Sequence, residues 1–207
     1  MKLSKKRANL RDFETVLKKN RLFVFRSKDV IRLFGWSDTG VKFLLHRYTK
    51  RGITVRLKSG LYMLGGATIP DFYLANCLQE PSYVSLETAL SHYQIIPETV
   101  YTITSITTRP PRERIALHKS YRYHRILPHA FTGYTAVVQG EFTSLVADPE
   151  KALVDYYYLV ARGQRKPLDI DRLRLEKLNL HKVCMYARLF KNPTLMKLLT
   201  ELFPQRI

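Results

Sequence analysis

Residues 39–58 carry the polar and cationic side chains whose spacing best fits a defined chemistry. Thr39, Lys42 and His46 recur at intervals of three and four residues, so a helix would project them from one face. Such a face can read base edges, because the major groove of B-DNA is wide enough to admit an α-helix. We therefore predict Thr39, Lys42 and His46 as candidate base readers.

Four further cations, Arg47, Lys50, Arg56 and Lys58, are predicted to contact phosphates, which position a protein on DNA without carrying sequence information. Residues 1–64 hold 17 basic and 4 acidic residues, a net charge of +13 out of +18 for the whole chain. This segregation indicates a polyanionic partner, which could be DNA, RNA or an anionic membrane surface. The basic tail at residues 1–9 could add phosphate contacts.

The elements that must position these side chains lie in residues 27–64, which we interpret as a helix, a tight turn, a second helix and a hairpin. Ser27 is a good N-cap for the first helix, and Gly35 can end it by adopting positive φ. Ser37 or Asp38 then caps the second helix. The buried face of that helix is predicted from residues at positions i, i+3, i+4 and i+7, namely Val41, Leu44, Leu45 and Tyr48.

The hairpin follows from a change of period after Gly52. Ile53, Val55 and Leu57 alternate with polar residues, which predicts a strand with one buried face. Ser59-Gly60 is suited to a turn, and residues 61–64 return as the partner strand. Arg56 and Lys58 are then expected on the exposed face and tip of a wing. This order of elements is typical of a winged helix-turn-helix.

The rest of the chain indicates a second domain. Residues 10–20 are predicted as the first helix of the winged module, and residues 22–25 as an edge strand. Gly65-Gly66 marks the boundary, so we expect a winged helix-turn-helix DNA-binding domain at 1–65 and a mixed α+β domain at 66–207 with a helical tail from Asp169. The predicted fold class is α+β.

Several details of the second domain bear on function. Asp148, Pro149 and Glu150 are a strong helix start, and the helix should run to about Ala161. Lys151 and Asp155 are expected to pair on its surface. One ring of the run Tyr156, Tyr157 and Tyr158 must point outward. The run could form an interaction patch, or it could belong to the packing of an amphipathic helix. A second basic cluster could touch flanking DNA, dock an acidic partner or simply be solvated: Arg109, Arg112, Arg114, Lys119, Arg122 and Arg125.

Catalytic chemistry is weakly indicated. Asp169 and Asp171 resemble the paired carboxylates of nucleotidyltransferases, but residues 163–166 lack the serine of the loop that such enzymes place upstream. Asp148, Glu150 and Lys151 loosely resemble a metal nuclease, but the required order of residues is absent. Helix capping explains these acids better. We predict no catalytic residue, no metal site and no cofactor.

The expected compartment is the cytoplasm. No apolar segment follows the basic N-terminus, so no signal peptide is predicted, and no stretch approaches the roughly 18 apolar residues of a transmembrane helix. Cys77 and Cys184 have no partner at zinc-ligand spacing, so reduced, buried thiols are expected. No membrane partner is predicted.

Four segments together resemble a known family: residues 56–64 (RLKSGLYML), 81–98 (PSYVSLETALSHYQIIPE), 147–159 (ADPEKALVDYYYL) and 168–180 (LDIDRLRLEKLNL). They are similar to the AbiE-type antitoxins of bacterial abortive-infection, type IV toxin–antitoxin systems. The resemblance implies an N-terminal DNA-binding domain that represses its own operon at inverted repeats. It also implies a C-terminal domain required to counteract a cognate nucleotidyltransferase-like toxin.

The expected function is therefore a sequence-specific transcriptional repressor that also acts as an antitoxin and binds double-stranded operator DNA, where it could self-associate. Two alternatives remain open at this point. One is a metal-dependent nuclease or nucleotidyltransferase-like enzyme targeted by its winged helix. The other is a winged helix that binds RNA or protein.

Overall fold

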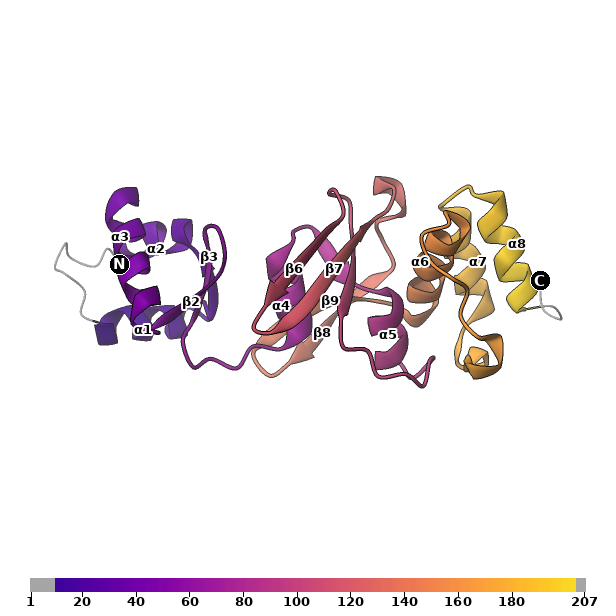
Figure 1. The fold of residues 1–207 in the computed structure, drawn as a ribbon, viewed down its shortest axis with the longest axis horizontal. Coiled ribbons are helices and arrows are strands. Elements are labelled where there is room, and N and C mark those ends of the chain that lie inside the picture. The colour runs from indigo at the N-terminus through magenta and orange to yellow at the C-terminus, as the bar shows by residue number, and fades with distance from the viewer. Residues whose placement is uncertain (1–9, 204–207) are drawn as a thin grey trace. The chain divides into compact units, whose positions relative to one another are not determined.

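The computed structural model describes residues 10–203 and has a mixed α+β fold (Figure 1). The chain separates into two compact units, residues 1–70 and 71–207, so the boundary lies a few residues beyond the predicted Gly65-Gly66. The basic tail at residues 1–9 lies outside the described residues.

Over residues 10–70, the N-terminal unit has three helices and a three-stranded antiparallel sheet of order β1-β3-β2. The predicted succession of helix, turn, helix and hairpin is present, and the predicted edge strand pairs with the returning strand of the hairpin. Its elements are α1 (Leu10–Lys19), β1 (Val24–Arg26), α2 (Ser27–Phe34), α3 (Asp38–Lys50), β2 (Thr54–Lys58) and β3 (Leu61–Leu64).

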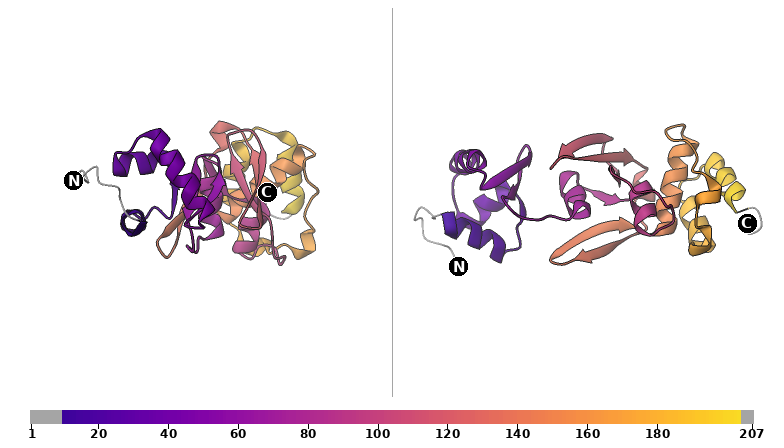
Figure 2. Two further views of the ribbon diagram at one scale, coloured as in Figure 1. Left: turned by 60° about the vertical axis from the view of Figure 1, so that its left-hand side comes forward. Right: turned by 60° about the horizontal axis from the view of Figure 1, so that its bottom comes forward.

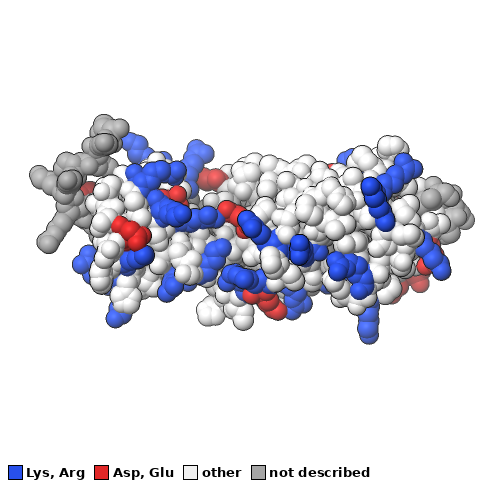
Figure 3. All heavy atoms as spheres, turned by 90° about the horizontal axis from the view of Figure 1, so that it is seen from above, with Lys and Arg blue, Asp and Glu red and all other residues white. Residues whose placement is uncertain are grey.

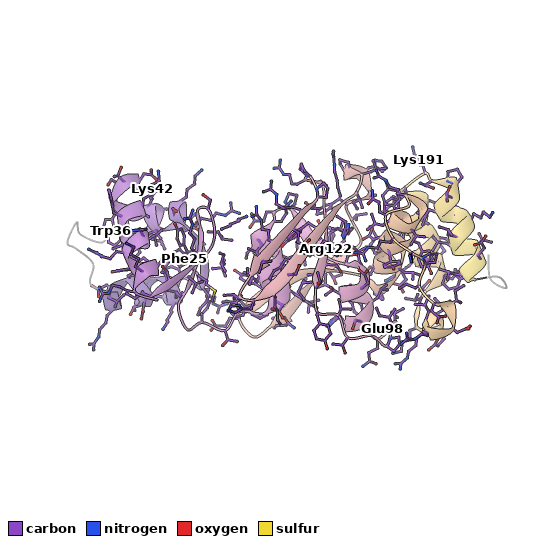
Figure 4. The ribbon with its side chains drawn as sticks, viewed as in Figure 1. Phe25, Trp36, Lys42, Glu98, Arg122 and Lys191 are labelled. Atoms are coloured by element: carbon purple, nitrogen blue, oxygen red, sulfur yellow. The ribbon has the colours of Figure 1, made fainter. Side chains whose placement is uncertain are left out.

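Aromatic rings hold this unit together. Phe13 of α1 stacks on Phe34 at 5.8 Å between ring centroids, and it meets the edge of Tyr48 at 5.1 Å and of Phe25 at 6.1 Å. All four side chains are buried, and Phe25 lies inside the unit (Figure 4). Because Tyr48 belongs to α3, this cluster fixes which side of α3 faces inward and therefore which side faces solvent.

The ends of α2 and α3 follow local rules. Gly35 ends α2 with a φ of 66°, as predicted, and the Ser37 hydroxyl accepts the amide of Gly40 at 3.1 Å to cap α3. The prediction of Ser27 as N-cap is wrong. Arg26 occupies that position, and the Asp29 carboxylate accepts its amide at 2.8 Å, because an acid at the third helical position can reach back to the cap.

The hairpin also departs from the predicted alternation. Val55 and Leu57 are only half-buried, whereas Thr54 is buried and its hydroxyl lies 3.1 Å from that of Thr49 at the end of α3. The pairing of β2 with β3 shifts between Arg56 and Lys58. Such a bulge turns the side chains beyond it, which a strict period of two does not anticipate.

The C-terminal unit contains a six-stranded mixed sheet of order β6-β7-β5-β4-β9-β8. The central β4 and β5 are antiparallel, and each lies parallel to one strand of an outer hairpin. The two outer hairpins lie on either side of α4 (Figure 2). Its strands are β4 (Ser82–Val84), β5 (Ile103–Thr107), β6 (Arg112–Ala116), β7 (Lys119–Arg125), β8 (Tyr134–Gln139) and β9 (Phe142–Ala147).

The sequence did not predict β4 and β6. The first is three residues long, and the second, RERIA, is mostly polar and exposed. The predicted helical tail is also partly wrong, because residues 170–179 form only two short 3₁₀ turns before α7. The helices of this unit are α4 (Asp71–Leu78), α5 (Leu86–His92), α6 (Pro149–Ala161), α7 (Leu180–Arg188) and α8 (Pro193–Leu202), with 3₁₀ turns at Pro128–Ala130, Ile170–Arg172 and Leu175–Lys177.

Helix α6 is the centre of the helical part of this unit. It packs against α5, α7 and α8 (Figure 1), so almost its whole circumference is covered. Tyr156, Tyr157 and Tyr158 are therefore all buried, which corrects the expectation that one ring must face outward. Within residues 10–203, every helix is too short or too polar to cross a lipid bilayer.

Candidate nucleic-acid interface

The solvent face of α3 gathers most of the residues predicted to contact DNA. Thr39, Lys42, His46 and Lys50 are all exposed, as is Arg47 on the flank of the same face. Their exposure follows from the packing described above, because the opposite side of the helix is buried through Val41, Leu45 and Tyr48. The arrangement presents hydroxyl, imidazole and cationic groups along one side of a 13-residue helix.

Two of these cations already have neighbours on the helix. Lys42 forms an ion pair with Asp38 at 2.5 Å, and both side chains are largely exposed. Exposed pairs of this kind contribute at most about 1 kcal/mol to stability. Lys42 can therefore leave the Asp38 carboxylate and bind another anion. Lys42 stands on the outer side of α3 (Figure 4). The Arg47 guanidinium lies 5.9 Å from the centre of the Tyr48 ring, which limits its directions.

The two predicted cations of the hairpin differ from each other. Arg56 is exposed on β2, where it lies opposite Tyr62 of β3. Lys58 is half-buried, which corrects the expectation of an exposed position at the tip. The shift of pairing between these two residues is the physical reason, because it changes the direction of the side chains beyond it. Arg56 is consequently the better placed of the two for a phosphate.

Phe43 is a surface residue to which the sequence reasoning assigned no role. It lies on the same face as Thr39 and His46, and its side chain is 72% exposed. A large apolar side chain within a polar helix face can contact the methyl group of thymine in the major groove. The signal was present in the sequence, because the helical period alone places an aromatic residue among the predicted base readers.

The surface charge agrees with the composition. On the face drawn in Figure 3, Lys and Arg side chains predominate over Asp and Glu on the N-terminal unit, and further basic side chains cover parts of the C-terminal unit. The basic cluster predicted in the C-terminal unit is not one patch, however. Arg112 and Arg114 of β6 lie opposite Tyr123 and Tyr121 of β7, whose hydroxyls bond to α4, whereas the alternating Arg122 projects from the other face of the sheet.

Lys151 and Asp155 form an ion pair, as predicted, but it is completely buried rather than at the surface. Both oxygens of the Asp155 carboxylate are used. One accepts from Lys151, and the other accepts from the hydroxyls of Tyr83 and Ser85 at 2.9 Å each. Lys151 also donates to the Tyr83 hydroxyl at 2.9 Å. This network joins α6 to β4 and to the residue that follows it.

Desolvation acts against both charges of this network. Burial lowers the pKa of Lys151 and raises the pKa of Asp155, because a low-dielectric interior disfavours the charged form of each group. The opposite charges and the hydroxyl donors act in the other direction. Burial and the neighbouring Asp155 also raise the pKa of Tyr83, which keeps its hydroxyl protonated as a donor.

The acids considered for metal chemistry have structural partners. Asp148 lies at the N-cap of α6, but its carboxylate accepts from the Tyr186 hydroxyl at 2.6 Å instead of capping the helix. Glu150 is buried and accepts the amide of Asn179 at 2.9 Å. Asp169 accepts the amide of Asp171 and caps a 3₁₀ turn. In the described part of the chain, no group of three or more His, Cys, Asp and Glu side chains could hold a metal ion.

No protein-family profile matches the chain, and no curated protein is significantly similar to it. Among solved structures, the chain is similar to the crystal structure of the RV2827C protein from Mycobacterium tuberculosis. The two are 16% identical and superpose with a TM-score of 0.49, over 91% of this chain and 79% of that one.

Proposed function

We propose that the protein is a cytoplasmic, sequence-specific DNA-binding transcriptional repressor. Its N-terminal unit is, in this proposal, a winged helix-turn-helix. In this proposal α3 is the recognition helix, the β2–β3 hairpin is the wing, and double-stranded operator DNA is the partner. The observation that carries the proposal is the solvent face of α3, on which Thr39, Lys42, Phe43 and His46 are all exposed. A face with hydrogen-bonding, cationic and apolar groups matches the mixed chemistry of base-pair edges.

We further propose that the repressor is the antitoxin of a type IV toxin–antitoxin system and regulates its own operon. The support is the resemblance of four segments to AbiE-type antitoxins, including residues 81–98 and 147–159 of the C-terminal unit. In this proposal, that unit counteracts a nucleotidyltransferase-like toxin. The separation of the chain into two compact units is compatible with such a division of roles.

Binding of the full chain to the DNA upstream of its own gene tests the proposal. Affinity is compared with that for a scrambled duplex of equal length and composition between about 50 and 200 mM salt. Specific binding should survive the higher salt, whereas binding to the scrambled duplex should collapse with the release of counterions. Equal salt-sensitive binding to both duplexes would contradict the proposal and reduce the N-terminal unit to an electrostatic anchor.

Arg56→Ala should weaken binding to all duplexes by the same factor, because a phosphate contact carries no sequence information. The slope of the logarithm of affinity against the logarithm of salt concentration should fall by about 0.9 for the one lost contact. Fluorescence anisotropy titrations at several salt concentrations measure this slope. Arg21→Ala, which removes one exposed cation outside the hairpin, is the matched control. A change in the ratio of specific to non-specific affinity would place Arg56 among the base readers.

Phe43→Ala should remove a preference for thymine. Replacing one thymine of the operator by deoxyuridine deletes a single methyl group, and burial of such a group is worth about 0.8 kcal/mol, or roughly fourfold in affinity. At one or more positions the wild-type protein should lose this factor, whereas Phe43→Ala should bind both duplexes equally. If both proteins lose the same factor, Phe43 is not the group that contacts the methyl.

A further inference from the structure

Two adjoining hollows lie in the C-terminal unit, whereas every residue proposed above to contact operator DNA belongs to the N-terminal unit. Each has a volume of about 430 Å³, within the size range of small-molecule sites. They share His124 of β7 and Gln164 of the loop after α6, so they lie next to each other on this unit. The two hollows have different chemical linings, and this difference decides what they could bind.

The first hollow is cationic. Arg122, Arg165 and Lys166 line it together with the shared His124 and Gln164, and among the described residues no carboxylate does so. Arg122 has an exposed partner in Glu113 at 3.3 Å, which is a weak pair that an anion can displace. Lys166 forms no ion pair with any residue between 10 and 203. Figure 4 shows Arg122 on the sheet of this unit.

The wall of this hollow is fixed before any ligand arrives. The Arg165 guanidinium pairs with Glu87, donates to Nε2 of His124 at 3.0 Å and lies 5.5 Å from the centre of the Tyr156 ring. Because arginine can only donate, Nε2 of His124 must be an unprotonated acceptor. Burial, with a smaller contribution from Arg122, lowers the pKa of His124 and keeps the ring neutral. Only the charges of Arg122 and Lys166 are then left for an anion.

The second hollow is more apolar than the first. Pro111, Ile126, Leu127 and Pro128 form its walls, while Arg125 and Arg162 complete the lining. Arg162 lies 5.7 Å from the centre of the Tyr158 ring, so its position is also restrained. Flat proline and aliphatic surfaces of this kind accept a planar heterocycle, and guanidinium groups can stack on one.

We infer that the two hollows bind a nucleotide, with its phosphates beside Arg122 and Lys166 and its base against Pro111 and Leu127. A ligand with an anionic end and a flat, weakly polar end matches the two linings in a single molecule. The same chemistry is offered by a free nucleotide and by one nucleotide of a single strand. This inference does not depend on operator binding, which uses the other unit.

Isothermal titration calorimetry of the full chain at about 150 mM salt tests the inference, with ATP, inorganic triphosphate and adenosine as probes. ATP should bind at least about tenfold more tightly than either half, because each half fills one hollow only. Arg122→Gln/Lys166→Gln should weaken ATP binding by about tenfold or more, through loss of charge-assisted contacts. The control Arg188→Gln/Lys197→Gln removes the same charge from exposed positions of α7 and α8 and should leave ATP binding unchanged.

A third variant separates a nucleotide site from a mere anion site. Leu127→Ser should weaken ATP binding severalfold and leave the affinity for triphosphate unchanged, because only the apolar hollow is altered. Binding of a ten-nucleotide single strand distinguishes a free nucleotide from a nucleotide within a strand as the natural ligand. If it binds more tightly than ATP with the same sensitivity to Arg122→Gln/Lys166→Gln, the natural ligand is a strand, whereas weaker binding indicates a free nucleotide.

Three results would overturn the inference. The first is the absence of saturable ATP binding, and the second is an equal loss in both double variants, which would mean diffuse charge attraction. The third is unchanged ATP binding in Leu127→Ser. Lys42→Ala/Arg56→Ala should lose operator DNA but keep ATP, so a failure of the nucleotide site and a failure of the proposed repressor function give different results.

Discussion

Asp155→Ala is expected to destabilise the C-terminal unit by about 3–5 kcal/mol, because it removes one partner of a completely buried ion pair. The loss falls on three donors at once. The ammonium of Lys151 and the hydroxyls of Tyr83 and Ser85 all lose the carboxylate as acceptor, although Lys151 keeps the Tyr83 hydroxyl, and none of these side chains is exposed to water. Domains are stable by only about 5–15 kcal/mol, so a large share of the folding free energy would disappear.

Urea unfolding followed with two probes measures this effect. Trp36, the single tryptophan of the chain, lies in the N-terminal unit, whereas most tyrosines lie in the C-terminal unit. The near-ultraviolet circular dichroism of tyrosine should therefore report the destabilised unit, while Trp36 fluorescence should be unchanged. Asp171→Ala removes an exposed acid from the same unit and should change stability by no more than about 0.5 kcal/mol.

A double-mutant cycle tests whether Lys151 and Asp155 act as a pair. Lys151→Met alone leaves a buried carboxylate with two neutral donors, so it too should destabilise the unit. The double variant Lys151→Met/Asp155→Ala should cost less than the sum of the two single variants, because neither charge then remains buried without its partner. Strict additivity would mean that the two groups contribute independently, contrary to the contacts described above.

Lys42→Ala/His46→Ala is expected to abolish the preference of the protein for its operator. Each well-placed side chain at a base edge is worth about 1–3 kcal/mol of discrimination, so losing two should lower specific affinity by roughly 30-fold or more. Binding to a scrambled duplex should fall far less, since the double variant removes one lysine and leaves the other lysines and arginines of the N-terminal unit in place. Competition titrations against both duplexes at one salt concentration give the ratio directly.

The control for this experiment is Lys18→Ala, which removes one exposed cation from α1. It should leave the ratio of specific to non-specific affinity unchanged. The exposed pair between Lys42 and Asp38 adds little to stability, so a loss of binding in the double variant cannot be attributed to unfolding of α3. If specific and non-specific affinity fall by the same factor, α3 is not the element that reads the operator.

The sequence by itself predicted the parts that depend on near neighbours along the chain. The 3.6-residue period of α3 shows which of its side chains face solvent, and Gly35 and Ser37 mark the helix ends through contacts within one turn. The concentration of basic residues before position 65 is also a property of the sequence alone. In each case the interacting residues are only a few positions apart, so their geometry follows from the helix itself.

Only the tertiary structure decided the rest. Lys151 and Asp155 have the spacing of a surface pair, and they are buried because the acceptor Asp155 meets Tyr83 and Ser85, some 70 residues earlier in the chain. The two hollows likewise join β7 to the loop after α6. A local pattern shows which side of a helix differs from the other. The segments that cover that side come from distant parts of the chain. Those segments determine both the free-energy cost of a buried charge and the shape of a cavity.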